Sequence, residues 1–134
     1  MSFPIYGIDL GGTTFNVGTV DEAGTVSHQS ERPTRGEDGP DVLIPRLCDG
    51  VRGVQQNLRE NAAFLDEEVS GSGAVGIGVP GVVRHKDGIC VYAPNLPGWT
   101  DLPVTHLLSE SLGLPTFIIN DANAAALAEA RFGA

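Results

Sequence analysis

The sequence predicts an α/β domain built on a mixed β-sheet with flanking helices. Three short strands separated by tight turns open the chain, which is typical of an antiparallel meander. Further along, two almost wholly apolar runs alternate with segments of helical spacing, which is typical of strands covered on both faces. With 134 residues, the chain has the length of one domain.

The predicted meander has strands over Ile5–Leu10, Phe15–Val20 and Thr25–Glu31. Asp21-Glu22-Ala23-Gly24 supplies the turn between the second and third strands. The polar segment from Arg32 to Gly39 is expected to be a surface loop.

A long amphipathic helix is predicted next. Pro45 should lie in its first turn, where the missing N–H costs little. Gly50 and Gly53 weaken the helix, so tertiary packing is expected to support it. Its apolar positions recur at helical spacing: Leu43, Leu47, Val51, Val54, Leu58 and Leu65.

The second half should contain two buried strands, Ala74–Val79 and Thr116–Ile119, and a loop rich in Pro and Gly from Ala93 to Asp101. The other predicted elements are a hairpin with strands Val82–Arg84 and Ile89–Tyr92, a short helix near Pro103–Leu112 and an Ala-rich helix over Ala122–Phe132.

Composition excludes several classes of protein. The net charge of −9 argues against a nucleic-acid or acidic-membrane surface. No apolar run approaches the ~20 residues of a membrane span, and the start of the chain has no signal-peptide pattern. Cys48 and Cys90 are isolated and not spaced as a metal clip, which indicates free thiols in a reducing cytoplasm.

The turn after the first strand has two interpretations. Asp9 is followed by Gly11, Gly12, Thr13 and Thr14. Adjacent glycines let a backbone approach phosphate oxygens, hydroxyl groups add donors, and the acid can hold Mg²⁺ directly or through water. An ordinary Gly-Gly hairpin turn explains the same residues equally well.

A second glycine-rich stretch formally matches a dinucleotide-binding motif. Gly76-Ile77-Gly78-Val79-Pro80-Gly81 has the G-x-G-x-x-G spacing. That motif must open a helix, whereas Pro80-Gly81 leads into a predicted hairpin, so the match is rejected. Neither glycine-rich stretch has the Gly-Lys-Ser/Thr ending of a Walker A loop.

Asn120-Asp121 falls where a buried strand meets a predicted helix. Asp121 could be a simple helix N-cap. It could also be a general base at the carboxyl end of a strand, taking a proton from a substrate hydroxyl. In the loop from Ala93 to Asp101, the amide of Asn95 suits a sugar hydroxyl. Trp99 in the same loop is more readily a buried anchor than a sugar platform.

Four motifs in order make the chain resemble the amino-terminal part of the ROK family (repressor, open reading frame, kinase), bacterial sugar kinases on the actin-like ATPase (ribonuclease H-like) fold. The motifs are Asp9-Leu10-Gly11-Gly12-Thr13, Gly76–Gly81, Pro94–Trp99 and Asn120–Ala126 with Glu129. Together they cover nearly the whole chain.

The resemblance implies a role for each matching residue. Asp9 and Gly11 to Thr13, with Thr14 beside them, would approach ATP and Mg²⁺, and Asp9 would be the metal residue. Gly81, Asn95 and Asn120 would line the sugar site, with Asp121 as the catalytic base. A departure is Thr14, which stands where many members carry Lys.

The implied reaction is ATP-dependent phosphorylation of a hexose, such as glucose, N-acetylglucosamine or mannose, by a cytoplasmic homodimer. Residues 1–134 would be the N-terminal actin-like domain and inactive alone, because the family's zinc signature and adenosine pocket belong to a C-terminal domain absent from this chain. Polyphosphate as the donor stays open. The alternatives are the sugar-sensing domain of a ROK repressor and a non-catalytic actin-like ATPase domain.

Overall fold

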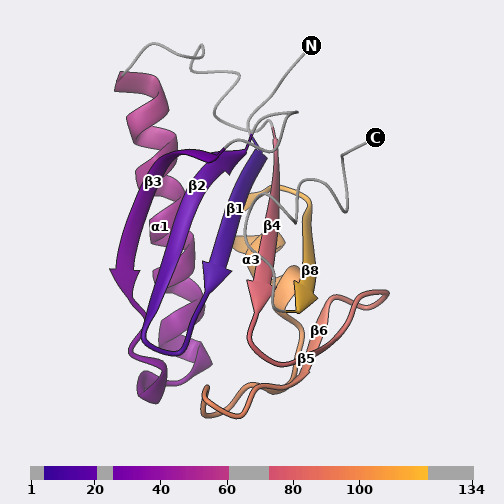
Figure 1. The fold of residues 1–134 in the computed structure, drawn as a ribbon. Coiled ribbons are helices and arrows are strands. Elements are labelled where there is room, and N and C mark those ends of the chain that lie inside the picture. The colour runs from indigo at the N-terminus through magenta and orange to yellow at the C-terminus, as the bar shows by residue number, and fades with distance from the viewer. Residues whose placement is uncertain (1–4, 21–25, 61–72, 121–134) are drawn as a thin grey trace.

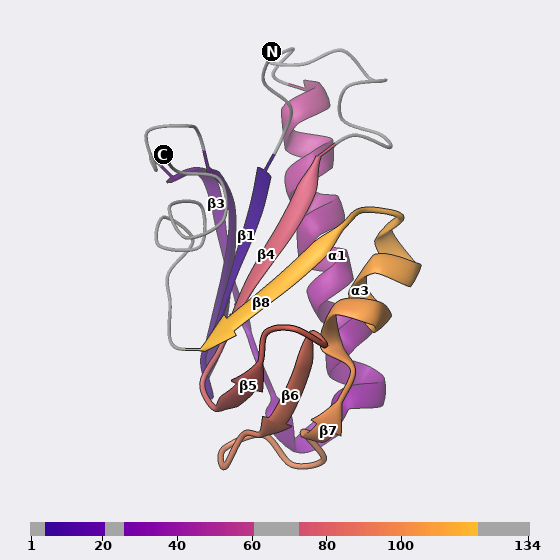
Figure 2. The same ribbon diagram turned by 90° about the vertical axis from the view of Figure 1, so that its right-hand side faces the viewer.

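The structure is a computed structural model that describes residues 5–20, 26–60 and 73–120. For residues 119 and 120 it describes the backbone alone. A five-stranded sheet has helices on one face and a small second sheet at one end (Figures 1 and 2). The predicted turn over 21–24 and the predicted helix over 122–132 lie outside the described residues.

The large sheet has the strand order β3-β2-β1-β4-β8. Its strands are β1 (Ile5–Leu10), β2 (Thr14–Val20), β3 (Val26–Pro33), β4 (Ala74–Val79) and β8 (Thr116–Asn120). The first three strands pair antiparallel, whereas β4 is parallel to both β1 and β8. The predicted mixed sheet with an antiparallel meander is therefore confirmed.

Helices α1 (Pro40–Glu60) and α3 (Val104–Leu112) lie on the same face of the sheet. The predicted periodicity of α1 is confirmed over the described part, since Leu43, Leu47, Val51, Val54 and Leu58 are all buried. They pack against alternate residues of the meander, which buries one face of the sheet: Tyr6, Ile8, Leu10, Phe15 and Val17.

The position of Pro45 is different from the prediction. Helix α1 begins at Pro40, so Pro45 lies inside the helix. Its missing N–H leaves the carbonyl of Asp41 without its usual helical donor, and Asp41 is exposed, so water can reach that end of the helix. The helix begins at Pro40, directly after Gly39 (φ 84°), whose carbonyl accepts the N–H of Leu43 in the first turn.

The segment predicted as a surface loop over 32–39 is also different. Strand β3 runs on to Pro33, and a 3₁₀ turn, η1, spans Gly36–Asp38. Thr34 and Gly36 are buried. The segment is therefore part of the packed structure, although its composition is polar.

The small sheet contains β5 (Val82–Arg84), β6 (Ile89–Tyr92) and β7 (Thr100–Leu102), in that order. The predicted hairpin is confirmed. β7 was not predicted, because three residues are too few to show an alternating pattern. This sheet lies beyond the carboxyl ends of β4 and β8 (Figure 2).

Candidate functional site

Three of the predicted site residues lie at one edge of the large sheet. The parallel strands β1, β4 and β8 all end there, as their arrowheads in Figure 1 show. Asp9 is paired with Gly78, and Val79 with Asn120, while Gly81 follows two residues after β4. In open α/β sheets, ligands bind outside the carboxyl ends of the strands.

The turn between β1 and β2 presents backbone donors at this edge. The N–H of Gly11 donates to the carbonyl of Thr14, 2.9 Å away, and closes the turn. Gly12 and Thr13 are exposed, and no hydrogen bond within the described part of the chain uses their N–H groups. Thr14 is the first residue of β2. Unpaired N–H groups in a turn are suited to binding an anion.

Asp9 lies on the sheet face that points away from α1. With Asn16 and Gln29, it lines a pocket of about 190 Å³ on that face. Its side chain is half-buried. Carboxylate and carbonyl oxygens are the donors that Mg²⁺ prefers, so Asp9 fits the predicted metal role in its chemistry.

The loop after β6 carries Asn95 and is held by buried apolar side chains. Trp99 is 0% exposed and Leu96 is 1% exposed. The N–H of Ala93 donates to the carbonyl of Trp99 at 3.1 Å, and that of Trp99 donates to the carbonyl of Leu96 at 3.1 Å. Trp99 is therefore an anchor rather than a sugar platform, as expected, while Asn95 is exposed.

Cys90 of β6 forms a hydrogen bond with the same loop. Its thiol is buried and donates to the carbonyl of Trp99, with 3.9 Å between sulfur and oxygen. Burial raises the pKa of this thiol above its usual value. Cys48 is also buried and free, so the predicted free thiols are confirmed.

The phosphate-like turn and the Asn95 loop come together in space. A methyl group placed on Gly12 would lie 3.6 Å from Cβ of Asn95. The two residues are 83 positions apart by subtraction of their numbers, 95 − 12. Their contact brings anion donors beside an amide that can bind a hydroxyl.

Gly81 packs closely on the start of the same loop. A methyl group at this position would collide with the carbonyl of Tyr92 and lie 2.9 Å from Cα of Ala93. The close approach of the two backbones explains why a residue without Cβ is needed here.

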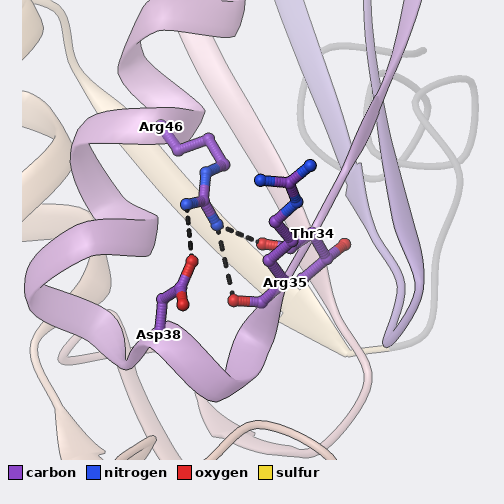
Figure 3. A network of polar contacts seen from close by, with 4 residues as sticks. All are labelled: Thr34, Arg35, Asp38 and Arg46. Carbon is purple, nitrogen blue, oxygen red and sulfur yellow. Dashed lines mark hydrogen bonds and ion pairs between the residues drawn. The ribbon is translucent and has the colours of Figure 1, made fainter.

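Two residues beside the turn were missed by sequence reasoning. Thr34 is fully buried, and its hydroxyl donates to the carbonyl of Gly11 at 2.8 Å. Arg46 of α1 in turn donates to the carbonyl of Thr34 at 2.5 Å and pairs with Asp38 at 2.8 Å (Figure 3). No local pattern could have found them, because the contacts join segments distant in sequence.

The last predicted residues are only partly described. Asn120 ends β8, which places its backbone at the site edge, and Asp121 lies outside the described residues. Within the described ranges, no three His, Cys, Asp or Glu side chains gather as a metal site. The described helices include none long and apolar enough to cross a membrane.

The strand order, with an antiparallel start and a parallel remainder, belongs to the actin-like ATPase fold, which solved sugar kinases share. The chain belongs to the ROK family, whose family model matches residues 5–134. It is 38% identical over 130 residues to the glucokinase of Thermotoga maritima, and 34% identical over 125 residues to the N-acetyl-D-glucosamine kinase of Citrobacter koseri. Those alignments cover 97% and 93% of this chain.

A solved structure shows the same likeness in three dimensions. It is a ROK family glucokinase from Streptomyces griseus, in complex with glucose and AMPPNP, with a TM-score of 0.75 and 32% identity. The match covers 98% of this chain and 37% of that one. The chain likewise spans 37% of the length of the Thermotoga and Citrobacter kinases.

Proposed function

We propose that the protein phosphorylates a hexose of the glucose type, with ATP as donor and the C6 hydroxyl as acceptor. The observation that carries this proposal is the contact between the turn at Gly12 and the loop at Asn95. One side of the contact is suited to phosphate and the other to a sugar hydroxyl, so a donor and an acceptor would meet there. Glucokinase and N-acetylglucosamine kinase relatives support sugar phosphorylation.

In this proposal, the N–H groups of Gly12 and Thr13 and the hydroxyls of Thr13 and Thr14 bind phosphate oxygens. Asp9 would hold Mg²⁺, which supplies positive charge against the phosphates when it is bound. Gly11 closes the turn through its bond to Thr14.

On the acceptor side, Asn95 and Asn120 hold sugar hydroxyls, and Gly81 lines the same site where it packs against the start of the loop that carries Asn95. Asp121 takes the proton from the attacking hydroxyl as general base. Positioning supplies most of the catalysis in phosphoryl transfer. The rigid hold on both loops is therefore the contribution of this domain.

We further propose that residues 1–134 form one domain of a two-domain kinase and are inactive alone. Support comes from the chain spanning little more than a third of its relatives. A kinase that closes two domains around its substrates excludes water, which one domain cannot do. We expect the complete protein to be cytoplasmic, in line with the free thiols of Cys48 and Cys90. We also expect it to be a homodimer, which sedimentation would test.

The decisive variant is Asp121→Asn in the complete protein. Phosphorylation should be abolished in a coupled assay, while glucose binding by calorimetry stays within about threefold of the parent, since the amide keeps the shape and loses only the base. Equal loss of phosphorylation and of glucose binding would indicate that Asp121 is a structural N-cap.

A second measurement tests the substrate and the rival functions. Turnover should appear with a hexose and ATP, and not with either alone. Tight ATP binding with no hexose dependence would favour a non-catalytic actin-like ATPase. Retardation of DNA by the complete protein would favour a ROK repressor, which the net charge of −9 disfavours.

A further inference from the structure

We propose that Thr34 and Arg46 position the phosphate-binding turn, with Thr34 holding the turn and Arg46 holding Thr34. The inference rests on the proposed function, because it concerns the same turn. Thr34 bonds to backbone carbonyls of the turn and Arg46 bonds to the carbonyl of Thr34, so both would act through the backbone.

Thr34 makes two hydrogen bonds to the turn, one on each side of Gly12. Its hydroxyl donates to the carbonyl of Gly11 at 2.8 Å, and its N–H donates to the carbonyl of Thr13 at 2.8 Å. Apart from aromatic residues and cysteines, it is the one buried residue with a polar or charged side chain in the described part of the chain. A buried hydroxyl is expected to form a hydrogen bond, and the Thr34 hydroxyl forms its hydrogen bond with the turn.

Holding the Gly11 carbonyl also aims the next N–H. The Gly11 carbonyl and the Gly12 N–H belong to one planar trans peptide and point in opposite directions. Thr34 binds the carbonyl on the protein side. The N–H of Gly12 therefore points away from the protein, toward the position of a bound anion.

The sheet cannot provide this hold by itself. The pairing of β2 with β3 ends at Thr14 and Pro33. Pro33 has no N–H to donate. Beyond that point, Thr34 is the residue of this segment that bonds to the turn.

Arg46 fixes Thr34 from helix α1. Its guanidinium donates to the carbonyl of Thr34 at 2.5 Å and to the carbonyl of Arg35 at 3.4 Å, and it pairs with Asp38 at 2.8 Å (Figure 3). The Arg46 side chain is 23% exposed, so water competes only in part. Charge-assisted bonds of this kind are stronger than neutral ones.

The bend that Arg46 ties down is an unusual one. Arg35 has φ 51° and ψ 54°, the left-handed backbone conformation that residues other than glycine rarely adopt. Such a conformation persists where surrounding contacts hold it. The Arg46 guanidinium supplies contacts on both sides of this bend, through the Thr34 carbonyl and Asp38.

The test uses the complete protein and compares Thr34→Val with Thr34→Ser. Valine keeps the shape and loses the hydroxyl, so the KM for ATP and the Kd for AMPPNP should rise about tenfold, the loss of one buried bond. The KM for hexose should stay within twofold. Serine keeps the hydroxyl and should restore both values to within threefold.

Arg46→Met should raise the KM for ATP in the same direction, and Arg46→Lys should rescue it poorly, because an ammonium group cannot reproduce the fork of a guanidinium. The matched control is Arg52→Met. Arg52 is also on α1 but pairs with Asp49 and bonds to Ser111, away from the turn. It should leave both KM values unchanged.

The proposal fails if Thr34→Val leaves the KM for ATP unchanged, and two further results would also overturn it. One is an equal rise in the KM for ATP and for hexose in Thr34→Val, and the other is failure of Thr34→Ser to rescue. Asp9→Asn is measured in parallel. If it raises the KM for ATP while Thr34→Val does not, only this inference fails; if neither has an effect, the proposed function fails with it.

Discussion

The two loops that meet at Gly12 and Asn95 are held in opposite ways. The turn at Gly11–Thr13 exposes Gly12 and Thr13, and polar contacts from Thr34 fix its backbone. The loop at Ala93–Trp99 is anchored by two buried apolar side chains, Leu96 and Trp99. One half of the candidate site therefore depends on hydrogen-bond direction, and the other depends on packing.

The difference has a chemical basis. Phosphate is bound by donors that must point at oxygen, so a turn that binds it needs oriented N–H groups. A loop that offers one amide side chain needs only a backbone fixed in position, which buried side chains can provide. Changes to the first loop should alter ligand affinity at little cost in stability, whereas changes to the buried residues of the second should lower the free energy of unfolding.

The largest effect is expected from Trp99→Ala. Removing this fully buried ring should lower the free energy of unfolding by about 3–5 kcal/mol. Urea denaturation of the 134-residue chain followed by circular dichroism measures it. Tyr92→Ala is the control: Tyr92 is 52% exposed and should change stability by less than about 0.5 kcal/mol. Similar losses for both variants would contradict anchoring by Trp99.

Gly98→Ala should come next, with a loss of about 1–3 kcal/mol. Gly98 has φ 85°, and a methyl group there would lie 2.7 Å from Cδ of Pro40. Gly39→Ala separates the two causes, because Gly39 has φ 84° with nothing within 4 Å. Equal losses in the two variants would show that the Pro40 contact costs nothing.

Gly12→Ala should act on binding instead of folding. The added methyl group makes an ordinary contact with Asn95 but stands between the two loops. Affinity for AMPPNP, measured by calorimetry on the complete protein, should fall about tenfold, or about 1.4 kcal/mol. Thr13→Ala keeps the backbone donors and should cost less. An unchanged affinity in Gly12→Ala would show that the turn does not face the phosphates.

The smallest effect concerns the pH dependence of the loop anchored by Trp99. Because burial raises the pKa of Cys90 above its usual value of 9.0, the folded state favours the neutral thiol. Its contribution to stability is complete below that pH and is lost as pH rises through the higher folded-state pKa. Urea denaturation at a series of pH values above that usual pKa should show this decline, and Cys90→Ala should flatten it.

Much of the fold could be predicted from the sequence, because periodicity is a local property. The spacing of Leu43, Leu47 and Val51 shows directly which face of α1 is buried. The start of α1 was placed too late, since Pro45 suggested a first turn that Pro40 already provides. β7 was missed because it has only three residues.

The candidate site could be predicted only where a motif carries it. Gly11 and Gly12 stand out in the sequence, but the support of Gly11 by Thr34 crosses 23 positions. The polar composition of 32–39 indicated a surface loop, and yet Thr34 is buried because its donors are satisfied by the turn. Such pairings arise from the sheet order, which local patterns do not contain.

Strand β3 stands at the end of the sheet order, paired to β2 alone in the described sheet. Its side chains alternate between half-buried and exposed, with polar Ser27, Gln29 and Glu31 outermost. The pairing shifts register opposite Gly18, and His28 there has φ 54°. An interrupted polar border of this kind is a poor template for a strand from another molecule, so the meander that carries the phosphate-like turn should resist aggregation at this border.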